Sequence, residues 1–330
     1  MYAQAALAFT SSLSLTAAVR GDYVKLPIMD RLAPANSGAN SYWRPSPQLG
    51  VSYRQGESLH AYGAVNAGFR APPALEIACA DATAPCSLPF ALGADPPLRP
   101  VSVLDYEAGI DVQPAPRVTV GVSTFLSDVH DDILFVQPTL ATGFFQNVMR
   151  TRRAGADASA SMDLARGLQA FGSYSYVAAT YRTPVHIASA LPDEPVTRPG
   201  DHFPDSPAQR ATIGVDVTRA LAHAAFEGAV ELHGVSGQFL RGDEANIRPP
   251  LPGYALTELR LIGHFARGSV RADVTNLFNR QYVNFGVYAQ NLRGPLGGPA
   301  PVSPDDAAVE RFLTPGQPRL FSVSVSIGED

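Results

Sequence analysis

Few residues of this 330-residue chain have the types and spacing that catalysis or metal binding requires. The sequence contains no Gly-rich phosphate loop, no Gly-x-Ser-x-Gly elbow and no His-Glu-x-x-His motif. Its seven histidines are scattered along the chain. His130 with Asp131 and Asp132 could bind a cation, although a solvated loop tip explains these residues more simply. We therefore expect no enzymatic activity, no bound metal and no other cofactor.

The two cysteines, Cys79 and Cys86, lie in a stretch rich in Pro and Ala. Two cysteines cannot complete a four-ligand zinc site, and no histidine is near them in the sequence. Free thiols are one interpretation. A short-loop disulfide in an oxidising compartment fits the pair better.

Charged side chains recur where a strand would turn them toward water. Asp and Glu at 105, 107, 111, 227 and 231 could pair with Arg260 and Arg271 on neighbouring strands. Because these residues alternate with apolar ones, we interpret them as the polar lining of a lumen and not as a catalytic pair.

The composition excludes several classes of protein. Hydrophobic residues make up 45% of the chain, which excludes disorder. With 30 acidic and 25 basic residues, the net charge of −5 gives no support for nucleic-acid binding. The longest weakly polar stretch, residues 3–19, is broken by Ser and Thr and is too short for a membrane-spanning helix. It also lacks a basic start, so we interpret it as structure and not as a signal peptide.

Strict alternation of apolar and polar residues recurs through nearly the whole chain. Such alternation predicts β-strands with one face in an apolar medium and the other against water. The apolar positions are rich in Ala, Gly and Val, whereas Asp, Glu, Arg and His occupy the middle of the polar faces. Thirteen strands are predicted, at residues 2–9, 13–24, 47–54, 58–70, 101–112, 117–129, 148–163, 168–182, 209–218, 224–236, 253–262, 269–276 and 318–327.

Short connections alternate with long ones along the chain. Loops of more than roughly a dozen residues are uncommon in compact soluble domains. Short turns on one rim and long loops on the other are typical of an outer-membrane β-barrel. The sequence therefore predicts an all-β protein, an antiparallel transmembrane β-barrel; a soluble β-sandwich or propeller is the alternative. The long loops are expected at residues 25–46, 71–100, 130–147, 183–208, 240–252 and 277–317.

Three motifs occur in order along the chain. Gly68-Phe69-Arg70-Ala71-Pro72 is followed by Glu76; Tyr106-Glu107-Ala108-Gly109 comes next; Asn276-Leu277-Phe278 precedes Tyr282. Together they resemble the C-terminal barrel of TonB-dependent outer-membrane receptors, with its GFRAP-x-x-x-E, YE-x-G and NLF-[DN]-x-x-Y stretches. We expect rim and turn roles for these residues, without ligand contact.

The resemblance implies that the chain is part of a larger protein. Receptors of this family have an N-terminal plug inside a 22-stranded barrel, and a short segment that contacts TonB. Thirteen strands would match the last thirteen of that barrel. We therefore expect residues 1–330 to be the C-terminal part of the barrel, with no plug domain and no signal peptide.

The resemblance also implies a function: uptake of an iron–siderophore complex or a similar nutrient across the bacterial outer membrane. The expected partners are outer-membrane lipids, a siderophore ligand and the TonB–ExbB–ExbD complex, which would act through the plug. Aromatic and Arg side chains in loops suit aromatic, anionic chelates. Alternatives are a passive porin-like channel and a soluble β-rich binding protein. The expected ligand contacts are Tyr42, Trp43, Arg44, Phe144, Phe145 and Gln146.

Overall fold

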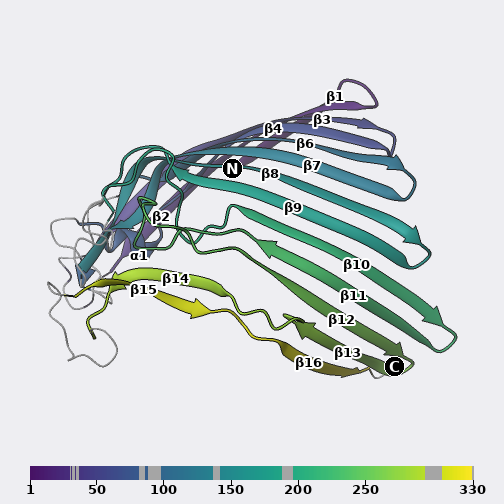
Figure 1. Ribbon diagram of the computed structural model, residues 1–330. Helices are drawn as coiled ribbons and strands as arrows, with labels where there is room; N and C mark the ends of the chain where they lie inside the picture. The colour runs from purple at the N-terminus through teal and green to yellow at the C-terminus, as the bar shows by residue number, and fades with distance from the viewer. Residues whose placement is uncertain are drawn as a thin grey trace.

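The computed structural model describes residues 1–29, 31, 34, 37–81, 86–87, 98–136, 142–187, 196–293 and 307–328. Most of the strands form one large antiparallel sheet that curves like the wall of a barrel (Figure 1). Its strands are β1 (Tyr2–Ala8), β2 (Leu13–Ile28), β3 (Gly38–Gln55), β4 (Leu59–Arg70), β6 (Val101–Ala115), β7 (Val118–Val136), β8 (Thr142–Ala165), β9 (Leu168–Tyr181), β10 (Gln209–Leu221), β11 (Ala224–Val235), β12 (Tyr254–Phe265), β13 (Gly268–Thr275) and β16 (Leu320–Ile327).

Each of these strands pairs with the next one along the chain, so the sheet is a simple up-and-down meander. The short strand β5 (Cys86–Ser87) pairs with β8, and the short helix α1 (Ala74–Ile77) follows β4. Strands β14 (Val283–Gln290) and β15 (Val309–Pro315) form a separate hairpin. Within the described residues, β1 and β16 are each paired on one side only, so the sheet remains open between them.

The thirteen predicted strands are confirmed, but several extend further toward the long connections. β2 continues to Ile28, β3 begins at Gly38, and β7 and β8 reach into the predicted loop 130–147. The loop expected at 277–317 contains the hairpin β14–β15. These boundaries were wrong because apolar alternation marks only the lipid-facing part of a strand. Beyond the hydrocarbon layer a strand can carry polar residues on both faces.

The sheet has one apolar and one polar face, as the pairing register of β7, β8 and β9 shows. Paired residues lie on the same face, and successive residues alternate between faces. On β8, residues 154–164 place Ala, Met and Leu on the outward face. Ala154 and Leu164 lie about 33 Å apart along the strand, or roughly 25 Å across the layer at the usual tilt. That distance matches the apolar band of an outer-membrane barrel.

The buried apolar clusters lie beside the long connections and not at the centre of the sheet. One cluster is formed by Leu98, Val101, Val129 and Ile133. A second contains Tyr181 with neighbouring aliphatic residues. No helix among the described residues is long and apolar enough to cross a membrane.

Candidate functional site

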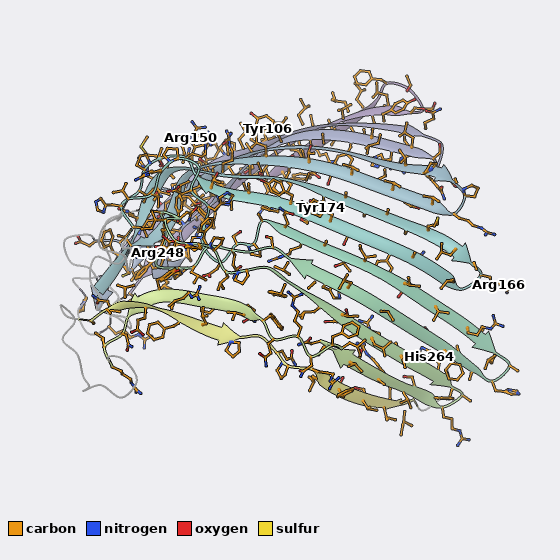
Figure 2. The ribbon with its side chains drawn as sticks, in the orientation of Figure 1. Tyr106, Arg150, Arg166, Tyr174, Arg248 and His264 are labelled. Carbon is orange, nitrogen blue, oxygen red and sulfur yellow. The ribbon has the colours of Figure 1, made fainter. Side chains whose placement is uncertain are left out.

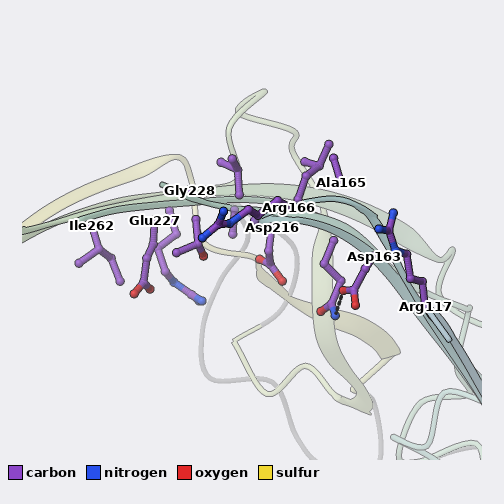
Figure 3. A pocket seen from close by; sticks show the side chains of 15 residues that line it. Arg117, Asp163, Ala165, Arg166, Asp216, Glu227, Gly228 and Ile262 are labelled. Carbon is purple, nitrogen blue, oxygen red and sulfur yellow. Dashed lines mark hydrogen bonds between the residues drawn. The ribbon is translucent and has the colours of Figure 1, made fainter. Parts of the chain in front are cut away.

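The polar face of the sheet forms an open hollow of about 850 Å³ near the short turns. Asp163 of β8, Asp216 of β10 and Glu227 of β11 line it. Figure 3 shows these three side chains beneath the arch of the sheet, on the side opposite Ala165. Asp163 accepts a hydrogen bond of 3.0 Å from the Gln169 amide. Arg117, Arg166 and Arg260 line the same hollow, so the concave face is a water-accessible surface of mixed charge at this level.

Higher on the same face, strands β11 to β13 carry a linked set of charges. Arg260 lies 3.9 Å from Glu231 and 3.4 Å from Asp273. Arg271 also binds Asp273, at 2.7 Å. The predicted pairing of Glu231 with Arg260 across strands is confirmed, whereas Arg271 pairs on its own strand. These alternating charges neutralise one another and keep the face polar.

The inward face of β4 and β6 carries the second predicted motif. The Tyr62 hydroxyl donates a hydrogen bond of 3.0 Å to Glu107. Gly109, two residues further along β6, lies beneath the Tyr62 ring. Tyr106 points to the opposite, outward face and is partly exposed, as an aromatic girdle residue would be. Glu107 and Gly109 therefore position Tyr62 within the protein.

The first motif forms the corner where β4 ends. Arg70 makes an ion pair of 2.9 Å with Glu76 of α1, and Pro72 between them is fully buried. Near the end of β4, Gly68 faces inward and Phe69 faces outward, because successive residues of a strand alternate between its two faces. The motif residues thus fold the chain over the rim.

The third motif fixes the chain after β13. The buried Asn276 amide donates to the carbonyls of Arg280 and Gln317, and its Oδ1 accepts the Arg280 N–H. The Leu277 N–H donates to Thr257. Phe278 is 76% exposed and contributes little to packing.

Tyr282 completes this third motif by packing against aromatic and glycine neighbours. Its ring centroid lies 4.4 Å from that of Tyr254. The backbone of Gly316, just before β16, lies so close to the Tyr282 ring that a side chain there would overlap it. Asn276 and Tyr282 thus tie the end of β13 to the start of β16.

A family profile described as TonB dependent receptor-like, beta-barrel, matches residues 1–277. The chain belongs to the TonB-dependent receptor family. Members of this family are bacterial outer-membrane proteins, and the location expected from the sequence is confirmed. A search of curated protein sequences finds no significant match.

Solved structures share the fold of this receptor chain at low sequence identity. The ferric yersiniabactin uptake receptor FyuA from Yersinia pestis matches 99% of the chain at 17% identity and a TM-score of 0.68. The copper transporter OprC matches 99% at 16% identity and a TM-score of 0.71. The ferric citrate transporter FecA matches 96% at 18% identity and a TM-score of 0.65. The chain covers 44%, 46% and 43% of these three proteins, respectively, so it spans less than half of their length.

The predicted ligand residues Tyr42, Trp43 and Arg44 lie in strand β3 of the receptor and not in a loop. Tyr42 is buried and donates a hydrogen bond of 3.2 Å to the carbonyl of Leu98. Trp43 points to the outward face and is 65% exposed. Arg44 lies inward, opposite Asp22. Only Arg44 of the three combines a charged side chain with an inward position.

The second predicted group, Phe144, Phe145 and Gln146, lies at the start of β8. Phe145 packs against the cluster that includes Leu98, and its ring meets Phe135 edge-on at 5.0 Å between centroids. Phe144 and Gln146 are partly buried beside β7. The structure therefore brings Tyr42 and Phe145 to the same segment at Leu98, where both serve packing. The loop placement of the two groups was wrong.

A buried polar network that sequence reasoning missed lies beside these residues. Asp132 accepts hydrogen bonds from Thr151 and Arg153, at 2.7 and 2.9 Å. The Arg153 guanidinium lies 5.2 Å from the ring centroid of Phe203. Asp132 thus belongs to β7, and its interpretation as part of a solvated loop tip was wrong. Among the described residues, no three His, Cys, Asp or Glu side chains are grouped as metal ligands.

Cys79 lies in the turn after α1 and is disulfide-bonded. Its carbonyl accepts a hydrogen bond of 2.6 Å from the N–H of Phe145. The backbone of Cys86 pairs with Gly143 of β8, but its side chain lies outside the described residues. The pairing of Cys79 with Cys86 stays a prediction.

The connection between β11 and β12 carries two buried carboxyl groups. Asp243 accepts the N–H groups of Ile247 and Arg248, and Glu244 accepts that of Gly242. Burial raises the pKa of both carboxyl groups despite these hydrogen bonds. Sequence reasoning missed this turn, although Gly-Asp followed closely by Asn is a turn signal that could have located it.

Proposed function

We propose that residues 1–330 are the C-terminal barrel portion of a receptor that takes up an iron–siderophore complex or a similar scarce nutrient. The observation that carries the proposal is the two-faced sheet. Its outward face is apolar over the height of a membrane, and its inward face is lined by charges from β3 to β13. A sheet of this kind separates lipid from an aqueous interior.

Three related structures support a metal-containing nutrient. They are named for ferric yersiniabactin, copper and ferric citrate. The three ligands differ in size and charge, so the fold alone is compatible with several of them. On this chain, an anionic chelate would meet Arg44 on the inward side of β3, because a guanidinium binds carboxylate and phenolate oxygens well.

Energy for uptake would come from the TonB–ExbB–ExbD complex. In the proposed full-length receptor, this complex acts on a plug domain inside the barrel. The linked charges of Glu231, Arg260 and Asp273 form a polar surface on the inward face, which the plug would contact. Dependence on TonB separates this proposal from a passive porin-like channel, which needs no energy.

The proposal is tested by growth of a strain that lacks its own iron receptors. The full-length gene containing this chain is supplied, and ferric catecholate, hydroxamate and citrate complexes are offered as sole iron sources. We expect growth on at least one complex, and loss of that growth when tonB is deleted. Growth that continues without TonB would support a passive channel instead. The Arg44→Gln variant should reduce uptake, whereas Arg219→Gln, at the opposite end of the strands, should not.

A further inference from the structure

A group of basic residues lies on the outward face of the sheet, at its long-loop end. His130 of β7, Arg150 and Arg152 of β8, and Arg182 just after β9 form this group, which we name the outer arginine cluster. His130 is paired with Arg150, and the N–H of Arg182 donates a hydrogen bond of 3.0 Å to the Arg150 carbonyl. The three residues therefore form a row across adjacent strands. Figure 2 shows Arg150 far from Arg166, which marks the short-turn end.

The cluster has more positive than negative charge. Asp128 accepts two hydrogen bonds from Arg152, at 2.7 and 2.9 Å, and lies 3.9 Å from Arg150. In the described part of the chain, Asp128 is contacted both by Arg152, which lies opposite it on β8, and by Arg150, which lies one row nearer the long loops. The Arg150 side chain keeps 46% of its surface exposed, against 16% for Asp128. Among the described residues, the three guanidinium groups of the cluster thus share one carboxylate, which leaves a net positive charge on the outward face.

The position of the cluster relative to the membrane follows from the strand geometry. Outward residues between 154 and 164 on β8 are apolar, and Arg152 is the next outward residue. The band below Arg152 is roughly 25 Å tall, the thickness of the apolar layer that such barrels cross. Tyr174 and Tyr176 of β9 are outward and exposed within this band. The cluster consequently lies at the level of the lipid headgroups on the side of the long loops.

We propose that the outer arginine cluster binds the phosphate groups of a phosphorylated lipid in the outer leaflet of the outer membrane. The planar guanidinium group matches phosphate oxygens with two parallel hydrogen bonds. Neighbouring strands are about 4.8 Å apart, so Arg150 and Arg182 can reach the same phosphate group. Asp128 holds Arg152 in place before the lipid arrives. The cluster faces away from the lumen, so this role is separate from nutrient uptake.

Lipid binding is tested on the full-length receptor, purified in an uncharged detergent and titrated with diphosphoryl lipid A in native mass spectrometry. The double variant R150Q/R182Q should weaken binding at least tenfold. R219Q is the matched control, because Arg219 is also outward and exposed but lies at the short-turn end. R150K/R182K retains the charge and should weaken binding less than the Gln variant does.

Two outcomes would overturn the proposal. The first is equal lipid A affinity for the wild type and for R150Q/R182Q, when heat-dependent mobility in gels shows that both proteins are folded. The second is competition by millimolar inorganic phosphate that removes lipid A completely, which would indicate a site for free anions. Retained binding of diphosphoryl lipid A, with none of phosphatidylcholine, would support it.

Discussion

The ring of Tyr62 lies directly over the Cα of Gly109 on the adjacent strand. A Cβ atom added at Gly109 would lie 2.6 Å from two ring carbons of Tyr62. The same tyrosine donates its hydroxyl to Glu107 at 3.0 Å. Two residues of the Tyr-Glu-x-Gly motif therefore serve one purpose, which is to seat an aromatic ring flat on the lumen wall.

Replacing Gly109 with Ala should destabilise the barrel. The new methyl group would displace the Tyr62 ring and break its hydrogen bond to Glu107, at a cost of about 1–3 kcal/mol. Urea unfolding of the full-length receptor in lipid vesicles measures this cost. Gly63→Ala is the control, because its nearest neighbour would be 3.7 Å away, an ordinary contact. Equal stability of the two variants would show that Tyr62 moves aside freely.

The assignment of the two faces predicts opposite effects for neighbouring substitutions on β7. Val122 faces outward opposite Ala158, and Ser123 faces inward opposite Asp157. Val122→Arg should cost about 2–4 kcal/mol near the membrane midplane. Ser123→Arg should be tolerated, because its charge meets Asp157 and water. Folding efficiency into vesicles, followed by gel mobility with and without heating, compares them. A greater loss for Ser123→Arg would reverse the assignment.

The fold could be predicted from sequence because the membrane imposes a strict pattern. Val118, Val120 and Val122 must alternate with polar residues wherever lipid contacts one face, so strand number and facing follow directly. The pattern ends where the lipid ends. Strand β3 therefore begins well before its predicted start, because Tyr42, Trp43 and Arg44 lie beyond the apolar layer.

The site was less predictable, because its residues are brought together by long connections. Asp132 and Arg153 are 21 positions apart in the chain and form an ion pair, although the register of β7 and β8 puts Asp132 opposite Val148 and Arg153 opposite Ser127. The left-handed backbone at Asp131 interrupts the alternation just before Asp132. Asp243 and Glu244 are buried where the connection after β11 meets two other segments, since Asn246 hydrogen-bonds His202 and the Arg241 carbonyl accepts the Tyr288 N–H. Alternation carries no information on such connections. Family motifs located the rim corners, at Arg70 with Glu76 and at Asn276, but not the polar groups between them.

A disulfide between Cys79 and Cys86 should stabilise the segment after β4. Closing a loop of about eight residues contributes roughly 2–3 kcal/mol by the loop-entropy estimate. Mass spectrometry of unreduced peptides should find the two cysteines linked in protein exported to the periplasm. The double variant Cys79→Ser/Cys86→Ser should increase proteolysis between residues 74 and 87. Two alkylatable thiols in exported protein would contradict the prediction.

The connection between β11 and β12 should loosen as the pH rises. Burial raises the pKa of Glu244 above its ordinary value of 4.5, and the side chain is 7% exposed. At a pH between the two pKa values, Glu244 in the folded segment therefore retains a proton that it releases in the unfolded segment. Its contribution to stability is complete below the ordinary pKa and declines as the pH rises through the folded pKa.

Hydrogen exchange of residues 236–253, corrected for intrinsic rates, measures this change. Protection in the wild type should fall as the pH rises above 4.5, the ordinary pKa of this carboxyl group. Glu244→Gln keeps an acceptor for the Gly242 N–H, so it should reduce the slope. Asp243 and Asp205, whose pKa values burial also raises, account for the remaining slope. Glu57→Gln, in an exposed short turn, should leave it unchanged. An unaltered slope in Glu244→Gln would exclude this group as the cause.

Residues 1–330 expressed alone should not form a pore. Strands β1 and β16 each have one paired side among the described residues, and their lipid-facing side chains are exposed. Unpaired backbone groups cost several kcal/mol each in hydrocarbon, so an open edge is not a stable state in a membrane. With a secretion signal added, this chain should aggregate or be degraded. The full-length receptor, expressed in parallel, should show a band whose mobility changes on heating. A heat-modifiable, TonB-dependent product from residues 1–330 alone would show that the two edges can close without further strands.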